Sequence, residues 1–211
     1  MSKRAANKQA RRQRLMAEAR SLYAANGVEN TTMEDVARAA GCTRRTLYAY
    51  FASAADLSLN VFVDDIAERW EFQKQAMAAG KTGHERIRLW AESYYAHARA
   101  HPETVHMQMF RDYRGLDRGA VGEDVERRHR EVIDPLIEAM NVEFRSGQAD
   151  GSIRPGLDPM TCLSQFAFSL RALMNRVLCS DDELGDFDPD RFVNSYIDLF
   201  MRGIAPEAEV S

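Results

Sequence analysis

The clearest chemical signal in this chain is a pair of adjacent arginines followed by a threonine, a tyrosine and an alanine, within the run TMEDVARAAGCTRRTLYAYF at residues 32–51. Leu47 and Phe51 are four residues apart and mark the buried side of a short helix. Arginine matches the O6 and N7 acceptors of guanine with two hydrogen bonds, and an alanine methyl can contact the methyl of thymine. The pattern favours base recognition in a major groove. The side chains predicted to face outward for this purpose are those of Arg44, Arg45, Thr46, Tyr48 and Ala49.

Two short helices joined by a tight turn would position these side chains. Thr31 and Thr32 each precede an acidic residue by three positions, which is the reciprocal capping pattern of a helix start. Apolar residues then recur at helical spacing as far as Gly41, where a positive φ costs least. Thr43 is placed to cap the second helix. The sequence therefore predicts a compact helix-turn-helix, a unit that reads DNA.

Charge is distributed unevenly along the chain. The formal net charge of −4 would argue against a nucleic-acid binder. Residues 1–60, however, hold ten Lys or Arg against five Asp or Glu, whereas residues 61–211 hold eighteen against twenty-seven. A basic amino-terminal part attached to an acidic body is expected when only one module touches phosphate. The composition, 45% apolar and 28% charged, is that of an ordinary globular protein.

Hydrophobic periodicity predicts an all-α fold of about nine helices with no strand. Residues 1–10 are polar and lack a hydrophobic period, so we expect them to be mobile. The next helix should present Arg11, Arg12, Arg14 and Arg20 on its outer face, where contact with phosphate is their expected use. Outside the helix-turn-helix, the predicted helices span about 11–26, 53–77, 84–99, 102–113, 123–145, 159–178 and 189–203.

Cysteine usage and hydropathy indicate a cytoplasmic protein. Cys42, Cys162 and Cys179 show no zinc-ligand spacing, so we expect buried free thiols, with a redox role for Cys42 left open. No apolar run approaches the roughly 18 residues that a membrane span needs. The start, MSKRAANKQARR, has no hydrophobic segment of the kind found in secretory signals.

These features resemble the TetR family of one-component bacterial transcription regulators. The resemblance is strong over residues 11–62, which follow that family's order of helix, helix-turn-helix and linking helix, and it is architectural over residues 63–205. It implies a DNA-binding domain with a basic arm at residues 1–52 and a helical effector-binding and dimerisation domain at residues 53–211. It also implies a dimeric repressor that a small-molecule effector releases from palindromic double-stranded operator DNA. The residues on which the resemblance rests are Gly27, Thr32, Val36, Ala37, Ala40, Gly41, Thr46, Leu47, Tyr48, Tyr50 and Phe51.

By position in that family, Arg44, Arg45, Thr46 and Ala49 would face base edges. Residues near phosphates would be Thr32, Thr43, Tyr48 and Tyr50. Two positions depart from the family pattern: Ala54 stands where a lysine is common, and Arg45 where a small residue is common. Adjacent helical residues are about 100° apart, so the two arginines cannot make the same contact. We predict that Arg44 reads a base, and that Arg45 contacts a phosphate in place of the missing lysine.

In similar proteins the central helices enclose the effector cavity. Aromatic and methionine side chains on these helices are our candidates for effector binding, although each also fits ordinary core packing. They are Trp70, Trp90, Tyr94, Met107, Met109, Phe110 and Tyr113.

The last predicted helix is apolar on two sides. One stripe comprises Phe192, Tyr196, Leu199 and Gly203. A terminal helix of a monomer needs only one apolar face, so the second face predicts a partner subunit. The alternative is a helix enclosed by two elements of its own domain. The residues predicted to form the dimer interface are those of the other stripe, Val193, Ile197, Phe200 and Ile204.

The case for a metal site or an active site depends on the histidines. His97 and His101 share one helix face, and the E-x-x-H spacing of di-iron bundles occurs at Glu103–His106 and Glu126–His129. Chance at this composition accounts for such pairs, and no Ser or Cys stands in a nucleophile elbow. We therefore expect no catalytic residue, no metal and no cofactor. A di-iron oxidoreductase is the enzyme alternative, and an activator or a ligand-independent regulator is the alternative within DNA binding.

Overall fold

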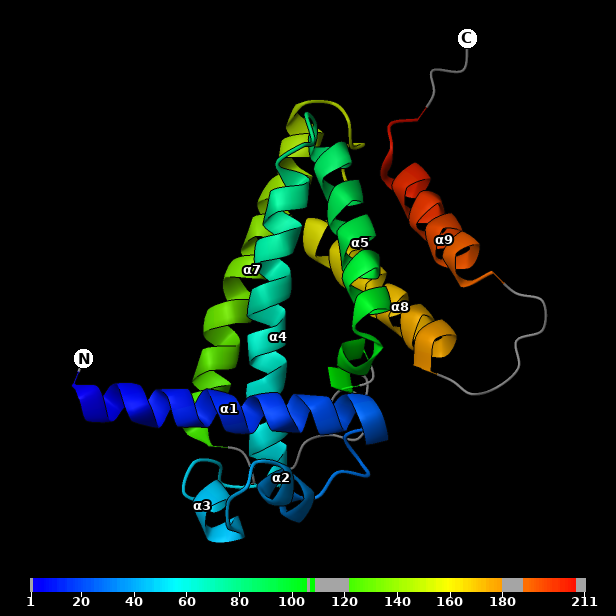
Figure 1. The fold of residues 1–211 in the computed structure, drawn as a ribbon. Coiled ribbons are helices and arrows are strands. Elements are labelled where there is room, and N and C mark those ends of the chain that lie inside the picture. The colour runs from blue at the N-terminus through cyan, green and yellow to red at the C-terminus, as the bar shows by residue number, and fades with distance from the viewer. Residues whose placement is uncertain (1, 106, 109–121, 180–187, 208–211) are drawn as a thin grey trace. The chain divides into compact units, whose positions relative to one another are not determined.

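The computed structural model describes residues 2–105, 107–108, 122–179 and 188–207. Regular structure in these ranges is entirely helical, which confirms the predicted all-α fold (Figure 1). Residues 102–105 and 107–108 are helical as well. The named helices are α1 (Lys3–Asn26), α2 (Met33–Ala39), α3 (Arg44–Tyr48), α4 (Ala54–Met77), α5 (Gly83–Ala100), α7 (Glu123–Ala149), α8 (Pro159–Cys179) and α9 (Pro189–Ile204).

The chain forms two compact units. Unit 1 comprises residues 1–66 and 103–131, and unit 2 comprises residues 67–102 and 132–211. Helices α4 and α7 therefore each contribute their first part to unit 1 and their remainder to unit 2. The functional division at residue 52 stays a prediction.

Helix α1 begins well before the predicted residue. The Ser2 hydroxyl accepts a hydrogen bond from the Ala5 N–H at 3.3 Å and caps the helix. The expectation that residues 1–10 are mobile is therefore wrong for residues 3–10, which form the exposed first turns of α1. Alanine, lysine, arginine and glutamine favour helix intrinsically, whereas the prediction had relied on a hydrophobic period that an exposed helix does not need.

The core of unit 1 holds the helix-turn-helix against α1 and α4. Helix α1 packs on α2, and α2 packs on α3. The apolar side of each helix follows the predicted i, i+4 spacing, and burial of such side chains stabilises the fold by about 1.5–3 kcal/mol each. Members that are almost fully buried include Leu15, Ala19, Val36, Leu47, Phe51 and Leu57.

The core of unit 2 is centred on α5, which packs against α8 and α9. A stack of aromatic rings joins these helices. The Phe166 ring lies 3.9 Å from that of Phe200, 5.7 Å from that of Tyr196 and 6.0 Å from that of Trp90, measured between centroids. Such contacts add to the energy of apolar burial.

Helix α7 passes through the predicted stop at Gly147 and ends at Ala149. The reason is packing. A Cβ on Gly147 would lie 2.5 Å from Ile153 Cδ1, and a Cβ on Gly83 would overlap the Gly147 backbone. These glycines allow the start of α5 to approach α7 directly, so Gly147 serves a close approach rather than a helix stop.

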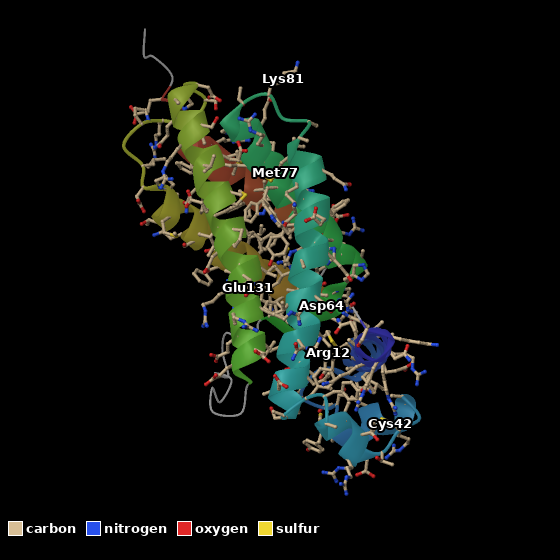
Figure 2. The ribbon with its side chains drawn as sticks, turned by 90° about the vertical axis from the view of Figure 1, so that its left-hand side faces the viewer. Arg12, Cys42, Asp64, Met77, Lys81 and Glu131 are labelled. Carbon is tan, nitrogen blue, oxygen red and sulfur yellow. The ribbon has the colours of Figure 1, made fainter. Side chains whose placement is uncertain are left out.

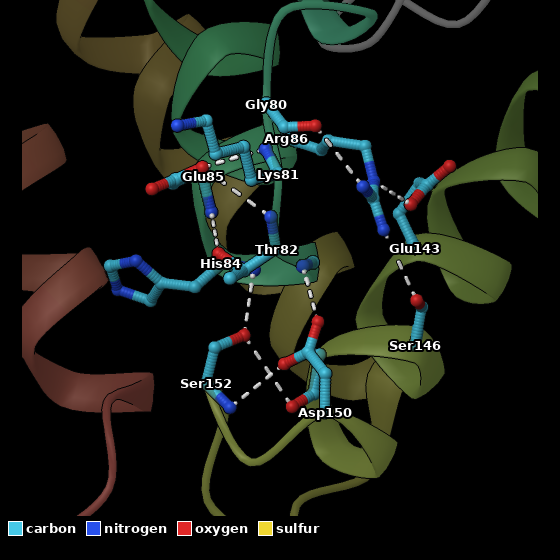
Figure 3. A network of polar contacts seen from close by, with 12 residues as sticks. Gly80, Lys81, Thr82, His84, Glu85, Arg86, Glu143, Ser146, Asp150 and Ser152 are labelled. Atoms are coloured by element: carbon cyan, nitrogen blue, oxygen red, sulfur yellow. Dashed lines mark hydrogen bonds and ion pairs between the residues drawn. The ribbon is translucent and has the colours of Figure 1, made fainter.

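Hydrogen bonds also join the start of α5 to the turn that follows α7 (Figure 3). Thr82 and Glu85 form a capping box at the start of α5. The Gly83 N–H donates to Asp150 Oδ2 at 2.9 Å, and the His84 N–H donates to Ser152 Oγ at 3.2 Å. The orphan amides of α5 are thus satisfied both by neighbours and by a turn 67 residues further along the chain.

Candidate nucleic-acid interface

A capping box fixes the start of α2, as predicted. The Asp35 N–H donates to Thr32 Oγ1 at 3.2 Å, and the Thr32 N–H donates to Asp35 Oδ2 at 3.0 Å. The Thr32 hydroxyl and N–H, with a smaller effect from Arg38, hold the pKa of Asp35 below its ordinary range. Thr31 has a different role, because its hydroxyl donates to the Gly27 carbonyl at 2.8 Å.

The turn and the start of α3 also follow the prediction. Gly41 has a φ of 60°, and the Cys42 N–H donates to the Ala37 carbonyl at 2.9 Å, which closes the end of α2. Thr43 caps α3 by accepting from the Thr46 N–H at 3.2 Å. Helix α3 therefore begins at Arg44, and both arginines stand in its first turn, the part of a recognition helix that meets base edges.

Burial orients α3. Leu47 and Phe51 are buried, whereas Arg44, Arg45, Tyr48 and Ala49 are exposed and Thr46 is half-buried, as predicted. Among the residues assigned to phosphates, Thr32 and Thr43 are exposed and Tyr50 is half-buried. The structure brings these side chains to the exposed surface of one helix-turn-helix. The individual contacts with bases and phosphates stay predictions.

The two arginines differ in their surroundings. Arg44 Nη1 lies 3.9 Å from a Glu34 carboxylate oxygen, and Arg38 pairs with the same carboxylate at 3.8 Å. Both side chains of the Arg44–Glu34 pair are mostly exposed, so the pair is weak and little energy is needed to release Arg44. Arg45 has no ion-pair partner in the described part of the chain.

The early turns of α1 extend the basic surface. No acidic residue precedes Glu18 in this helix, and Arg11 and Arg14 are exposed. A cleft of about 320 Å³ brings this end of α1 beside the end of α3. The basic arm and the predicted DNA-reading surface are thus neighbours within unit 1. The residues that line the cleft are Ala5, Lys8, Gln9, Arg12, Ala49 and Tyr50.

Arg12 does not lie on the outer face of α1, contrary to the prediction (Figure 2). Its guanidinium lies 5.2 Å from the centroid of the Phe51 ring and donates to Asn60 Oδ1. Arg12 precedes Leu15 and Met16 by three and four residues, so it belongs to their buried stripe. That spacing could have identified it from the sequence.

A polar cluster around Asn60 was not predicted. Asn60 Oδ1 also accepts from Arg128 of α7 at 3.0 Å, and Arg128 donates to Asp64 at 2.6 Å. Asp56 accepts from the Ala52 N–H at 2.8 Å and from the Gly122 N–H at 3.3 Å. The local signal for this cluster is the spacing of Asp56, Asn60 and Asp64 at i, i+4 and i+8 across the mostly apolar run of residues 57–63.

The effector candidates separate in the structure. Trp90 and Tyr94 are buried with ring centroids 6.0 Å apart, and Met107 is buried. Trp70 is half-buried, with the Lys74 ammonium 5.8 Å from its ring. The remaining candidates, Met109, Phe110 and Tyr113, lie outside the described residues.

The buried side-chain atoms of unit 2 that have no hydrogen-bond partner in the described part of the chain include Gln73 Oε1, Trp90 Nε1 and Asn141 Oδ1. The Arg69 guanidinium of α4 lies 4.4 Å from the centroid of the Tyr94 ring of α5. The two helices run antiparallel, so Gln73, one turn after Arg69, is at the height of Trp90, one turn before Tyr94. The 2.5 Å contact between Arg86 and Glu143 places Asn141 near that level on α7. Two acceptors and one donor therefore occupy one layer of the interior.

Burial divides the two stripes of α9. Val193, Ile197 and Ile204, predicted for the dimer interface, are buried within the chain's own core, and Phe200 is half-buried against Phe166. They cannot present their side chains to a partner without leaving that core. The large apolar side chains exposed on α8 and α9 are instead those of Met160, Phe168, Phe192 and Leu199.

Within the described ranges, no group of three or more His, Cys, Asp or Glu is arranged to hold a metal ion. The rings of His97 and His101 are 4.9 Å apart, and His129 stacks on Phe62. His106 lies outside the described residues. The three cysteines are free thiols, half-buried rather than buried, and burial followed by the charge of Asp158 raises the pKa of Cys162. Over the same ranges, no helix has the length and apolar character needed to cross a membrane.

Residues 15–61 match the model of a family described as bacterial regulatory proteins, tetR family. A comparison with curated protein sequences finds no match. Solved structures give likeness over nearly the whole chain. The transcriptional regulator FadR from Bacillus subtilis, in complex with stearoyl-CoA, is 17% identical over 91% of this chain and 98% of its own, with a TM-score of 0.71.

Two further structures agree with this likeness. The ketosteroid transcriptional regulator KstR2 of Mycobacterium tuberculosis is 19% identical over 93% of this chain and 96% of its own, with a TM-score of 0.63. RolR in complex with resorcinol is 17% identical over 97% of this chain and 92% of its own, with a TM-score of 0.65. At these identities the likeness shows a shared fold.

Proposed function

We propose that this chain, which belongs to the tetR family of bacterial regulatory proteins, is a homodimeric DNA-binding transcription regulator that a small-molecule effector releases from a palindromic operator. The observation that supports DNA binding most directly is the exposed helix α3, capped by Thr43, with Arg44 and Arg45 in its first turn. In a dimer, two such helices would enter successive major grooves roughly 34 Å apart. Bound over a promoter, the dimer would act as a repressor.

DNA recognition would divide between the two arginines. Arg44, at the first position of α3, would leave Glu34 and donate to a guanine, while Arg45 and the basic turns of α1 would contact phosphates. Arg44→Ala should then cost about 1–3 kcal/mol at one base position and relax the preference there. Arg45→Ala should weaken binding to all sequences alike and flatten the salt dependence by about one ion per half-site.

A binding selection on randomised DNA at two salt concentrations tests this division. The unmodified protein should recover a palindrome, and each alanine variant should show its own pattern of loss. Equal, sequence-independent losses for both variants would contradict base reading by either arginine. If the protein were an activator, it would bind the same operator, but deletion of its gene would reduce transcription of the regulated genes.

Dimerisation would use the exposed apolar side chains of α8 and α9. Leu199 is 65% exposed, whereas Ile197 of the opposite stripe is 1% exposed. Leu199→Glu should therefore give folded monomers with weak operator binding, because one half-site contributes too little affinity. Ile197→Glu should unfold unit 2, since it would bury an unpaired charge.

Sedimentation at micromolar concentration distinguishes these cases. Val142→Glu is the matched control, because Val142 is 51% exposed on α7 and is equally apolar. It should leave the dimer intact. A monomeric unmodified protein, or a dimer that survives Leu199→Glu, would contradict the proposed interface.

Effector binding is supported by the unpaired layer in unit 2. A ligand that donates to Gln73 and Asn141 and accepts from the Trp90 N–H would satisfy three buried polar atoms at once. The first probes are stearoyl-CoA and resorcinol, the ligands named for two structures of the same fold. Emission from Trp90 in a Trp70→Phe background should change on binding, together with release of operator DNA. Release without any change at Trp90 would place the effector elsewhere.

A further inference from the structure

Asn60 occupies an unusual position on α4, where arginines from two other helices meet its side chain. It is 2% exposed. Its Oδ1 accepts from Arg12 of α1 and, at 3.0 Å, from Arg128 of α7. Its Nδ2 donates to the Asp56 carbonyl at 2.8 Å, which fixes the orientation of the amide. An amide oxygen accepts two hydrogen bonds, so its acceptor capacity is filled.

Each arginine is also held on its far side by a different partner. The Arg12 guanidinium covers the Phe51 ring, and Arg12 lines one cleft with Ala49 and Tyr50, the residues that follow α3. Arg128 donates to Asp64 at 2.6 Å. Arg12 therefore contacts the end of the recognition helix, whereas the hydrogen bonds of Arg128 in the described ranges go to α4.

The two guanidiniums influence one another through charge as well. Burial lowers the pKa of Arg12, the charge of Arg128 lowers it further, and Asp64 and Asp56 oppose this effect. Two cations at one neutral acceptor are held in place by the two nearby carboxylates. If Arg128 moved away, Arg12 would be the one arginine left at the Asn60 oxygen, and its position between Asn60 and the end of α3 would change.

We propose that Asn60 is a positioning residue: by accepting from Arg12 and Arg128 together, it makes the placement of α1 and of the end of α3 depend on α7. Both α4 and α7 continue from unit 1 into unit 2, so a shift of α7 relative to α4 would reach the helix-turn-helix through this oxygen. The proposal rests on the proposed DNA-binding function. Under this proposal Arg128 affects DNA affinity, although it belongs to none of the predicted DNA-contacting elements.

A matched pair of variants on α7 tests this effect. Arg128→Gln removes the donor to Asn60, and Arg127→Gln removes the same charge from the adjacent residue. Arg127 is 60% exposed, and its ion-pair partners among the described residues are Asp124 and Glu131 of its own helix. We expect Arg128→Gln to weaken binding to the selected operator about tenfold with an unchanged salt slope, because no phosphate contact is lost. Arg127→Gln should bind as the unmodified protein does, and equal affinity of the two variants would overturn the proposal.

A double-mutant cycle establishes the route. In an Arg12→Gln background, Arg128→Gln should have no further effect on operator affinity, because Arg12 is the group through which it acts. Additive losses would overturn the proposal. Asn60→Asp keeps an acceptor for both arginines while it loses the donor to the Asp56 carbonyl. It should retain operator binding, which separates loss of the contact with the arginines from general damage.

Hydrogen exchange in the free protein separates this proposal from the proposed function. Arg128→Gln should increase exchange of the α3 amides, and Arg127→Gln should leave them unchanged. This result is independent of DNA. If the selection recovers no operator while exchange responds as expected, DNA binding fails and the positioning role stands. If an operator is recovered but Arg128→Gln changes neither the exchange of the α3 amides nor the operator affinity, the positioning role is wrong and the DNA-binding function stands.

Discussion

Each unit holds one cluster of buried polar side chains, and the two clusters differ in how their members are paired. In unit 1, the Asn60 side chain uses its oxygen for two arginines and its nitrogen for a backbone carbonyl. In unit 2, the oxygens of Gln73 and Asn141 and the indole N–H of Trp90 are equally buried but have no partner in the described ranges. Both clusters lie among apolar helices, and neither consists of exposed charges.

The difference separates two uses of a polar group in a core. A fully paired network makes one arrangement of helices preferable to others, because any shift leaves a buried group unpaired. An unpaired buried atom costs about 1–3 kcal/mol, which is compensated when a ligand supplies the partner. The cluster in unit 1 therefore suits positioning of helices, and the layer in unit 2 suits recognition of a small molecule.

The largest expected effect comes from replacing Asn60 by leucine. This substitution keeps the size but leaves the Arg12 guanidinium without its acceptor and removes one from Arg128. We expect the free energy of unfolding to fall by about 2 kcal/mol, since two half-buried cations would lose a shared acceptor. Urea unfolding followed by circular dichroism measures the change. A loss below about 1 kcal/mol would mean that water replaces the amide and that the cluster is not tightly packed.

The opposite sign is expected for Asn141→Leu in unit 2. Removing a buried amide whose oxygen has no partner in the described ranges should leave the free energy of unfolding unchanged or raise it by about 1 kcal/mol. The same variant should respond less to effector. Asn194→Leu, at an exposed position of α9, is the control and should change stability by less than about 0.5 kcal/mol. Destabilisation by Asn141→Leu comparable to that of Asn60→Leu would remove the contrast between the units.

Helix starts give a smaller contrast. The start of α2 depends on Thr32 and Asp35, whereas the start of α5 has a capping box and two further acceptors, Asp150 and Ser152. Thr32→Ala should cost about 1 kcal/mol of unfolding free energy. Thr82→Ala should cost less than half as much, because the adjacent amides of Gly83 and His84 keep their partners. Equal losses in thermal unfolding would show that the distant acceptors add nothing.

The smallest effect concerns acid. Hydrogen bonds from Thr32 lower the pKa of Asp35, and hydrogen bonds from Ser152 and Gly83 lower that of Asp150. A carboxylate whose pKa is lower in the folded state stabilises the fold above its unfolded pKa of about 4, and this stability is lost as pH falls through the folded value. Asp35→Asn and Asp150→Asn should each make the fall of stability below about pH 4 shallower. Acid titration at fixed urea measures the slope, and an unchanged slope would contradict the assignment.

Local sequence signals predicted the helix-turn-helix closely. Thr32, Gly41, Thr43 and Leu47 occupy the capping, turn and buried positions expected of them. Each of these roles is decided by neighbours within four residues, so a single sequence contains the information. The early turns of α1 were missed for a related reason: helix propensity alone supports them, without the apolar period on which the prediction relied.

Contacts distant in sequence were decided only by the tertiary structure. Arg128 and Asn60 are 68 residues apart, and no local pattern pairs them. Arg12 was expected to face solvent, because arginine usually does, yet α4 supplies an acceptor that keeps it inside. The sequence of α9 by itself determined that the helix has two apolar sides. Docking against α5 and α8 decided that Val193 and Ile197 are the buried ones, because either stripe could fill the core until its neighbours were in place.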